Sequence, residues 1–176
     1  KNIIVDAKSG VTGAGRGLKL QNSFCECTEN MKAYKVATHR HTSEIEQELS
    51  NVAGEEIMIS FTPHLIPQKR GILSTIYVNL NRKSSAEELT EMYKEFYKDE
   101  FFVRVKEVGD LPETKHVAGS NFVDIGVCYD ERLQRAVVVS SLDNIVKGAA
   151  GQAVQNMNLL FGLDEKTALT NPGFYL

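Results

Sequence analysis

Two runs of apolar residues on either side of residue 132 constrain the fold of this chain more than any other feature. They are NFVDIGVCYD at residues 121–130 and RAVVVSSL at residues 135–142, with a turn expected at Glu131 and Arg132. Valine and isoleucine are β-branched and favour extended backbone, and a hairpin-length connection joins strands that run antiparallel. The pair therefore predicts a sheet that is antiparallel in at least this part.

Further apolar runs predict more strands for the same sheet. EIMISFTPH at residues 56–64 and RGILSTIYVNL at residues 70–80 are joined by a proline-containing loop, and FFVRVKE follows at residues 101–107. Runs of this kind, bounded by Gly, Pro, Asn or Asp, are typical of strands. A short apolar run at residues 2–5 leads into a glycine-containing loop at residues 9–17, and a second long loop covers residues 108–120.

Two Ser-x-x-Glu patterns predict where helices begin. The first, at residues 43–46, predicts a short helix that runs to about Asn51 and stops before Gly54. The second, at residues 85–88, begins a helix that is expected to pack on the sheet. The apolar residues on one face of this second helix are Leu89, Met92, Tyr93, Phe96 and Tyr97.

A third helix is expected over residues 143–161, and its interior glycines are unusual. Gly148 and Gly151 each cost about 1 kcal/mol relative to alanine, so something should come close to the backbone there. One interpretation is tight packing on the sheet, and the other is a cofactor over the small residues near Asn144. With this helix, residues 1–176 read as one α+β domain with an antiparallel or mixed sheet and packed helices.

The composition argues against several classes of function. The chain has 20 basic and 23 acidic residues without blocks of either sign, which argues against nucleic acid or an anionic membrane as the main partner. No apolar run approaches the roughly 20 residues needed to span a bilayer, and no signal peptide opens the chain. Three cysteines are too few, and odd in number, for a disulfide framework. We therefore expect a soluble cytoplasmic protein.

The stretch HRHTSEIEQ at residues 39–47 places two histidines two residues apart. If the backbone is extended there, His39 and His41 point to one side and Arg40 to the other. Such a pair can hold a metal, move a proton during catalysis or form the polar end of a strand. Zinc is disfavoured even with Cys25 and Cys27 as further ligands, because the spacing of both pairs is shorter than structural zinc sites use. We expect no metal.

The glycine-containing loop SGVTGAGRGLKL does not match the common nucleotide-binding motifs. The dinucleotide pattern read from Gly13 and Gly15 needs a third glycine where Leu18 stands, and the P-loop pattern fails at Arg16 and Gly17. The backbone amides of such a loop can still bind a phosphate or a carboxylate. A flexible surface loop is an equal alternative.

Four strings carry a resemblance to a known family. They are VDAKSGVTGAGRG, AYKVATHRHTSEIEQ, FTPHLIPQKRGI and DNIVKGAAGQAVQNMNLLFG, in the family's order and over nearly the whole chain. Together they resemble N-acetyl-gamma-glutamyl-phosphate reductase. The resemblance implies the catalytic and dimerisation domain shared with aspartate-semialdehyde and glyceraldehyde-3-phosphate dehydrogenases, and a homo-oligomer. It also implies the reduction of an acyl phosphate to an aldehyde by NADPH, in arginine biosynthesis.

The chain departs from the family pattern because the family's nucleophile is not found in it. That cysteine lies in a Pro-Gly-Cys-Tyr-Pro-like turn before the DAKSG string, and most of a nucleotide-binding domain precedes it. Cys25, Cys27 and Cys128 lack this context, so we expect buried or inert thiols. The chain begins at Lys1 without a methionine, and we expect an inactive fragment whose helix at residues 143–161 faces the nucleotide-binding domain.

The resemblance also assigns roles to residues in the four strings. It implies that His41 is the catalytic acid or base, with His39 beside it, because an imidazole exchanges protons near neutral pH. Arginine suits phosphate and carboxylate groups because its planar fork makes bidentate contacts. The expected substrate-binding residues are Arg16, Arg70, Ser9 and Gly10. The expected contacts to NADPH are Thr12, Gly13, Asn144 and Gly148.

Two alternatives to this function remain open. The first is a domain of an enzyme like aspartate-semialdehyde dehydrogenase, with the same fold and a different acyl phosphate. The second is a domain that binds a metal or a protein partner without catalysis.

Overall fold

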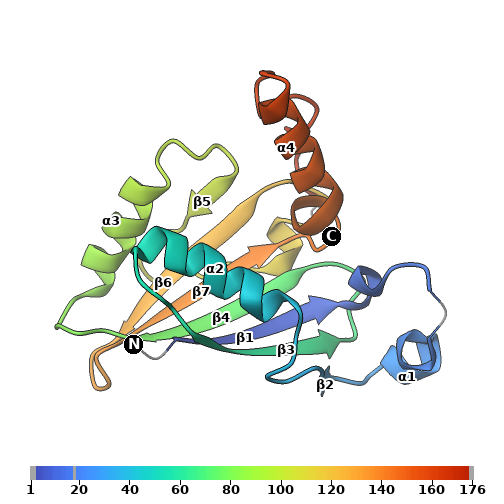
Figure 1. The fold of residues 1–176 in the computed structure, drawn as a ribbon, viewed down its shortest axis with the longest axis horizontal. Coiled ribbons are helices and arrows are strands. Elements are labelled where there is room, and N and C mark those ends of the chain that lie inside the picture. The colour runs from blue at the N-terminus through green and yellow to red at the C-terminus, as the bar shows by residue number, and fades with distance from the viewer. Residues whose placement is uncertain (1–2, 18, 175–176) are drawn as a thin grey trace.

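Seven strands form one mixed sheet, in the order β2-β3-β1-β4-β7-β6-β5 (Figure 1). The structure is a computed structural model that describes residues 3–17 and 19–174, so Asn2 of the expected first strand lies outside the described residues. Strand β1 pairs in parallel with β3, β5 pairs in parallel with β6, and the other neighbours are antiparallel. The strands are β1 Ile3–Gly10, β2 Lys32–Ala33, β3 Ile59–Ile66, β4 Ile72–Asn79, β5 Val103–Val105, β6 Val123–Asp130 and β7 Arg135–Leu142.

Helices cover one face of this sheet. Figure 1 shows α2 and α3 lying along the sheet, while α4 rises from the end of the sheet near the C-terminus. The α-helices are α1 Phe24–Cys27, α2 His41–Ala53, α3 Ala86–Phe96 and α4 Gly151–Leu160. Single turns of tighter or wider helix are η1 Val11–Ala14, η2 Leu20–Asn22, η3 Thr114–His116 and η4 Val146–Ala150, the last of which is a π-helix. None of the helices in the described ranges has the length and apolar character of a membrane span.

The strand register places the core on the helix-covered face. Val5 pairs with Ile76, Ile76 with Val138 and Val138 with Val127, so these side chains form one row across four strands. Because side chains alternate between faces, the even-numbered residues of β1 lie on the other face. The buried cluster of Leu89, Ile125, Val127, Ala136 and Val138 joins α3 to this row. The expected antiparallel pair of strands and the mixed sheet are confirmed.

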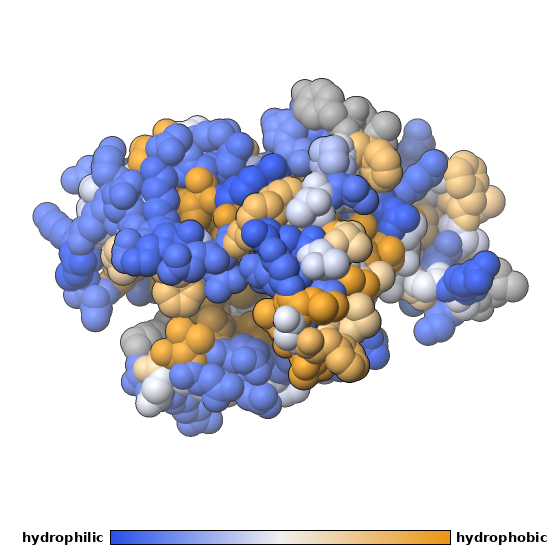
Figure 2. Space-filling view, turned by 90° about the horizontal axis from the view of Figure 1, so that it is seen from above, coloured by the Kyte–Doolittle hydropathy of each residue, from blue (hydrophilic) through white to orange (hydrophobic). Residues whose placement is uncertain are grey.

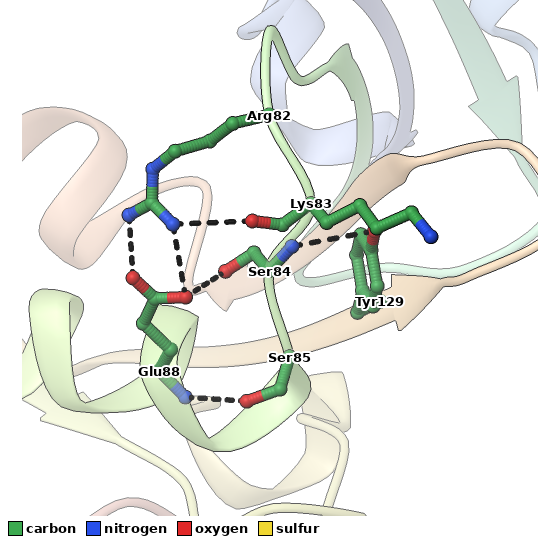
Figure 3. Close-up of polar contacts among 6 residues, drawn as sticks. All are labelled: Arg82, Lys83, Ser84, Ser85, Glu88 and Tyr129. Atoms are coloured by element: carbon green, nitrogen blue, oxygen red, sulfur yellow. Dashed lines mark hydrogen bonds and ion pairs between the residues drawn. The ribbon is translucent and has the colours of Figure 1, made fainter.

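The predicted start of α3 is confirmed in detail (Figure 3). The Ser85 side chain accepts a hydrogen bond from Glu88 N–H at 3.1 Å, as a helix cap does. The Glu88 carboxylate is bound by the Arg82 guanidinium and accepts from Ser84 Oγ at 2.6 Å. The bond from Arg82, followed by that from Ser84, lowers the pKa of Glu88 to about 2. The charged carboxylate also complements the positive end of the helix dipole.

The apolar face predicted for α3 is only partly correct. Leu89 is buried, and Tyr93 and Tyr97 pack against the core beside it. Met92 and Phe96 are instead more than half exposed. The helix contacts the sheet along a narrower stripe than the sequence indicated.

The predicted start of α2 is wrong. The helix begins at His41 and Ser43 lies inside its first turn, where its hydroxyl reaches back to Arg40 O at 3.4 Å. Glu46 does not cap the helix but accepts a hydrogen bond from Ile59 N–H at 3.0 Å, which ties α2 to β3. The predicted end is confirmed, because Gly54 adopts a left-handed conformation with φ of 67°.

The element expected over residues 143–161 is not one regular helix. It begins as a turn, continues as the π-helix η4 and becomes α-helical only at Gly151. A Cβ atom at Gly151 would lie 2.4 Å from Asn121 Oδ1, so this glycine is required for packing. A Cβ at Gly148 would meet Leu142 Cδ1 and Asp143 O at 3.3 Å, a milder contact on an exposed residue. Packing therefore explains Gly151 better than Gly148.

The lengths of several other elements differ from the predicted ones. Strand β1 reaches Gly10, so Ser9 and Gly10 belong to a strand, and η1 follows directly. Strand β5 has three residues in place of seven, because Phe101 and Phe102 leave the sheet edge and join Phe122 in an aromatic cluster. The turn between β6 and β7 has four residues, and Gln134 takes a positive φ of 48° there.

Candidate functional site

Three separate segments meet where β1 ends, and they form the first half of the candidate site. The backbone of Gly10 donates to Gly71 O at 2.9 Å, and that of Val11 donates to Gln68 O at 2.8 Å. A Cβ at Gly10 would lie 2.9 Å from Lys69 O, so glycine lets the loop of residues 67–71 lie directly against the strand. We use the name anion loop for residues 67–71.

Asn144 joins the anion loop to η1 from the third segment, just after β7. Its Oδ1 accepts from Gly71 N–H at 2.8 Å, and its Nδ2 donates to Thr12 Oγ1 at 3.0 Å. The Thr12 hydroxyl donates in turn to Lys69 O at 2.5 Å. A Cβ at Gly13 would lie 3.4 Å from Asn144 Nδ2 and 3.8 Å from Ser9 Oγ. The structure therefore brings together five predicted residues from the ends of β1 and β7.

The two predicted arginines belong to the same region but lie on its surface. Arg70 lies within the anion loop, and Arg16 follows η1; both are exposed. Neither guanidinium makes an ion pair with the described residues, although lysines and other arginines of the chain do. Unpaired guanidinium groups beside backbone held in place suit an anionic ligand. Gly148 is exposed near Leu142 and Asp143, but no contact joins it to the anion loop.

The histidine pair forms the second half of the candidate site. It does not lie on a strand, because His39 ends a turn and His41 is the first residue of α2. The His39 ring packs edge-on against Tyr34, Phe61 and His41, with ring centroids 5.6, 5.3 and 4.8 Å away. The His41 side chain is exposed. The interpretation of the pair as a polar strand end is therefore wrong.

The structure distinguishes the surroundings of the two histidines. His39 Nδ1 accepts a hydrogen bond from the backbone N–H of His41 at 3.1 Å, so His39 caps the start of α2 with that nitrogen unprotonated. Burial lowers the pKa of His39, and the nearby charges of His41, Lys35 and Arg40 lower it further. The neutral imidazole of His39 is engaged at the start of α2, whereas the imidazole of His41 is exposed.

The two halves of the site lie at different places along the sheet. Phe61, against which His39 packs, is paired with Val5, whereas Ile66 is paired with Gly10. Five residues of strand correspond to about 16 Å. The structure therefore does not bring the histidines into contact with the anion loop.

Three residues of these clusters were not predicted from the sequence. Tyr34 contacts His39, and burial raises the pKa of its phenol. Lys69 lies beside Arg70 in the anion loop, and Gly71 adopts a φ of 104° with Thr114 where its side chain would be. The Arg-Gly pair after Pro67 was a signal for Gly71. No sequence signal pointed to Tyr34, because its contact with His39 forms only when the chain folds.

The cysteines do not form a second site. All three are free thiols, and Cys25 is exposed, so of the two expected alternatives, buried or inert, burial does not hold for that residue. Cys27 is partly buried, with Sγ 3.2 Å from Gln21 O. Within residues 3–17 and 19–174, no three His, Cys, Asp or Glu side chains are grouped so that they could hold a metal ion.

Comparison with known protein families identifies the family to which this fold belongs. The family described as "Semialdehyde dehydrogenase, dimerisation domain" matches residues 1–144, which include both halves of the site. The chain belongs to this family. The membership agrees with the resemblance seen in the sequence, and the described fold is that of a semialdehyde dehydrogenase dimerisation domain.

Curated relatives extend the comparison over the whole chain. A protein of Acetivibrio thermocellus named N-acetyl-gamma-glutamyl-phosphate reductase is 66% identical over 176 residues, which are 100% of this chain and 51% of that protein. A protein of the same name from Caldicellulosiruptor saccharolyticus is 57% identical over 99% of this chain and 50% of its own length. The chain thus spans about half the length of the curated relatives it matches.

Solved structures share the fold at low identity. Aspartate semialdehyde dehydrogenase II of Vibrio cholerae matches with a TM-score of 0.70 at 19% identity, over 92% of this chain and 55% of that one. A probable aspartate-semialdehyde dehydrogenase of Pseudomonas aeruginosa matches with a TM-score of 0.69 at 17% identity, over 91% of this chain and 55% of that one. These likenesses confirm the predicted fold class of this dimerisation domain.

The lowered pKa of His39 makes the stability of the dimerisation domain depend on pH. An unfolded histidine titrates near pH 6.5, so below that pH the unfolded chain takes up a proton that folded His39 resists. This contribution is complete above about pH 6.5 and is lost as the pH falls. His39→Asn keeps a hydrogen-bond acceptor but does not titrate. Between about pH 7.5 and pH 5.5, the melting temperature of the wild type should fall further than that of the variant; parallel decreases would contradict the expectation.

Proposed function

We propose that this chain is the catalytic and dimerisation half of an N-acetyl-gamma-glutamyl-phosphate reductase. The observation that carries the proposal is 66% identity, over every residue, to a curated protein of that name. The proposed reaction reduces N-acetylglutamyl phosphate to N-acetylglutamate semialdehyde with release of phosphate, a step of arginine biosynthesis. The three thiols remain free, which supports a reducing compartment such as the cytoplasm.

The proposed chemistry needs a thiolate, which we place in the half of the protein outside this chain. The thiolate attacks the acyl carbon, the C–O bond to phosphate breaks and a thioester forms. NADPH, when bound, supplies the hydride that reduces the thioester to the aldehyde and releases the thiol. In this scheme His41 takes the proton from the thiol and returns one when the thiol is released. His39 holds the backbone of His41 through their hydrogen bond.

The anion loop is proposed to bind the charged groups of the substrate. Arg70 and Arg16 are exposed and unpaired with the described residues, so their guanidinium groups can bind phosphate and carboxylate in bidentate fashion. The backbone beside Arg70 is fixed on the end of β1 by Gly10. The residues proposed to lie against the cofactor are Thr12, Gly13 and Gly148. Exposed small residues at Gly13 and at 148–150 fit this role, because they let a flat ring approach the backbone.

The free end of α4 is proposed to contact the half of the protein outside this chain. Leu160 and Phe161 are 85% and 77% exposed, and Leu159, Leu163 and Met157 are exposed beside them. Figure 2 looks down on this end and shows hydrophobic side chains gathered among hydrophilic ones. A continuous apolar surface of this kind is unusual on a protein that stands alone.

The open face of the sheet is proposed to pack against a second copy of the protein. This face carries half-buried apolar side chains from three neighbouring strands, Ile4, Leu73, Tyr77, Val137 and Val139. The face lies opposite α2 and α3 (Figure 1). These apolar side chains suit an isologous dimer interface, in which each copy presents the same surface to the other.

An assay of the full-length protein tests the proposed activity. NADPH oxidation should be at least about 100-fold more efficient with N-acetylglutamyl phosphate than with aspartyl phosphate. The 176-residue chain alone should turn over neither substrate. Preference for aspartyl phosphate would favour the aspartate-semialdehyde alternative. Bound metal without reduction of either substrate would favour the domain without catalysis.

His41→Asn in the full-length protein should lower kcat by two orders of magnitude or more, the usual scale for loss of a general acid or base. The melting temperature should stay within a few degrees, because the side chain is exposed. Arg40→Ala is the matched control, since Arg40 is an exposed neighbour without a proposed role. Turnover by His41→Asn close to that of the control would remove His41 from the mechanism.

Sedimentation of the full-length protein at about 10 µM should show a dimer or a larger assembly. Thr75→Arg should weaken this assembly, because Thr75 lies in the middle of the open face between Asp6 and Val139. Met92→Arg, on the exposed side of α3, should leave it intact. A monomeric wild type, or equal effects of the two variants, would refute the interface.

A further inference from the structure

Asn144 is 5% exposed, and both ends of its carboxamide are engaged. Gly71 N–H can only donate, so the atom that faces it must be Oδ1, and Nδ2 then faces Thr12. The Thr12 hydroxyl accepts from Nδ2 and donates its own proton to Lys69 O. These hydrogen bonds form one chain in which donation runs from Gly71 N–H through Asn144 and Thr12 to Lys69 O, so the chain joins the residues on both sides of Arg70.

The anion loop is held from its other edge by β1 and η1. Gly10 donates to Gly71 O, and Val11 donates to Gln68 O. Glycine is required at position 71, because its φ of 104° is unfavourable for other residues and an added Cβ would lie 2.7 Å from Thr114 Cβ. The bonds through Asn144 therefore complete a frame in which the residues before and after Arg70 are both fixed.

We propose that Asn144 is a positioning residue that holds the anion loop and thereby orients the Arg70 guanidinium toward the anionic group of the substrate. The proposal differs from the expectation that Asn144 contacts NADPH, because its carboxamide is committed inside the protein. The identity of the anion as an acyl phosphate rests on the proposed function. The loop-holding role rests on the hydrogen bonds alone.

The first measurement does not depend on activity. In the full-length protein, hydrogen exchange of the Gly71 amide should become at least about 10-fold faster in Asn144→Ala, because that amide loses its acceptor. The control is Asn79→Ala, which removes an exposed asparagine at the other end of β4 that accepts from Arg135 Nε. Unchanged protection of Gly71 would overturn the loop-holding role.

The second measurement separates positioning from general destabilisation. Asn144→Ala should raise KM for the acyl phosphate about 10-fold, the effect of losing a directed hydrogen bond, and leave the Kd of NADPH within about 2-fold. In an Arg70→Ala background the same substitution should add little, because both changes act through one guanidinium. Additive effects, or a larger rise in the Kd of NADPH than in KM, would overturn the proposal.

Two further experiments cover an inactive wild type and an Asn144→Ala variant that does not fold. If the wild type reduces no acyl phosphate, the proposed function fails, and binding of inorganic phosphate to wild type, Asn144→Ala and Arg70→Ala by calorimetry replaces the kinetics. Weaker binding in both variants supports positioning, and unchanged binding in Asn144→Ala refutes it. If Asn144→Ala does not fold, Thr12→Val breaks the same chain of bonds at constant volume, and Thr12→Ser should restore it.

Discussion

Burial of one face of the sheet is the constraint on which the rest of the structure depends. The row of Val5, Ile76, Val138 and Val127 lies under the helices. A shift of the strand register by one residue would turn Asp6 and Thr75 toward the core. The same alternation places Gly10 on the open face at the end of β1. The anion loop crosses β1 at this point, and its backbone occupies the space that a side chain would need.

The parallel pairing of β1 and β3 determines how the two halves of the site are separated. The chain leaves β1 at Gly10 and returns to β3 at Ile59, and the crossover carries Arg16 and both histidines. The anion loop follows the end of β3, whereas His39 packs near its beginning, on Phe61. The anion loop and the histidine pair are thus attached to one sheet at separate positions.

Local patterns predicted those parts of the structure that depend on neighbouring residues. The pair of β6 and β7 and the start of α3 followed from short-range signals, and both were confirmed. The Ser-x-x-Glu pattern at residues 43–46 has the same letters but failed, because His39 Nδ1 supplies the cap and β3 engages Glu46. Arg70, Thr12 and Asn144 came from the family resemblance, whereas Lys69 and Gly71 of the anion loop were not predicted. The hydrogen bond from Asn144 to Thr12 joins residues 132 positions apart, and a pattern of neighbouring residues cannot predict a contact over that separation.

The two glycines Gly148 and Gly151 have different surroundings within one element. Gly151 faces the buried Asn121, whose amide donates to Gln155; Gln155 also accepts from Lys147 and donates to Glu165. Burial lowers the pKa of Lys147, and its engagement with Gln155 fixes the base of α4. The helix is therefore anchored at one end by polar bonds and presents apolar residues at the other. Gly148 is exposed, and a Cβ there would meet Leu142 Cδ1 and Asp143 O at 3.3 Å, a milder contact than the one at Gly151, so packing restricts this position less.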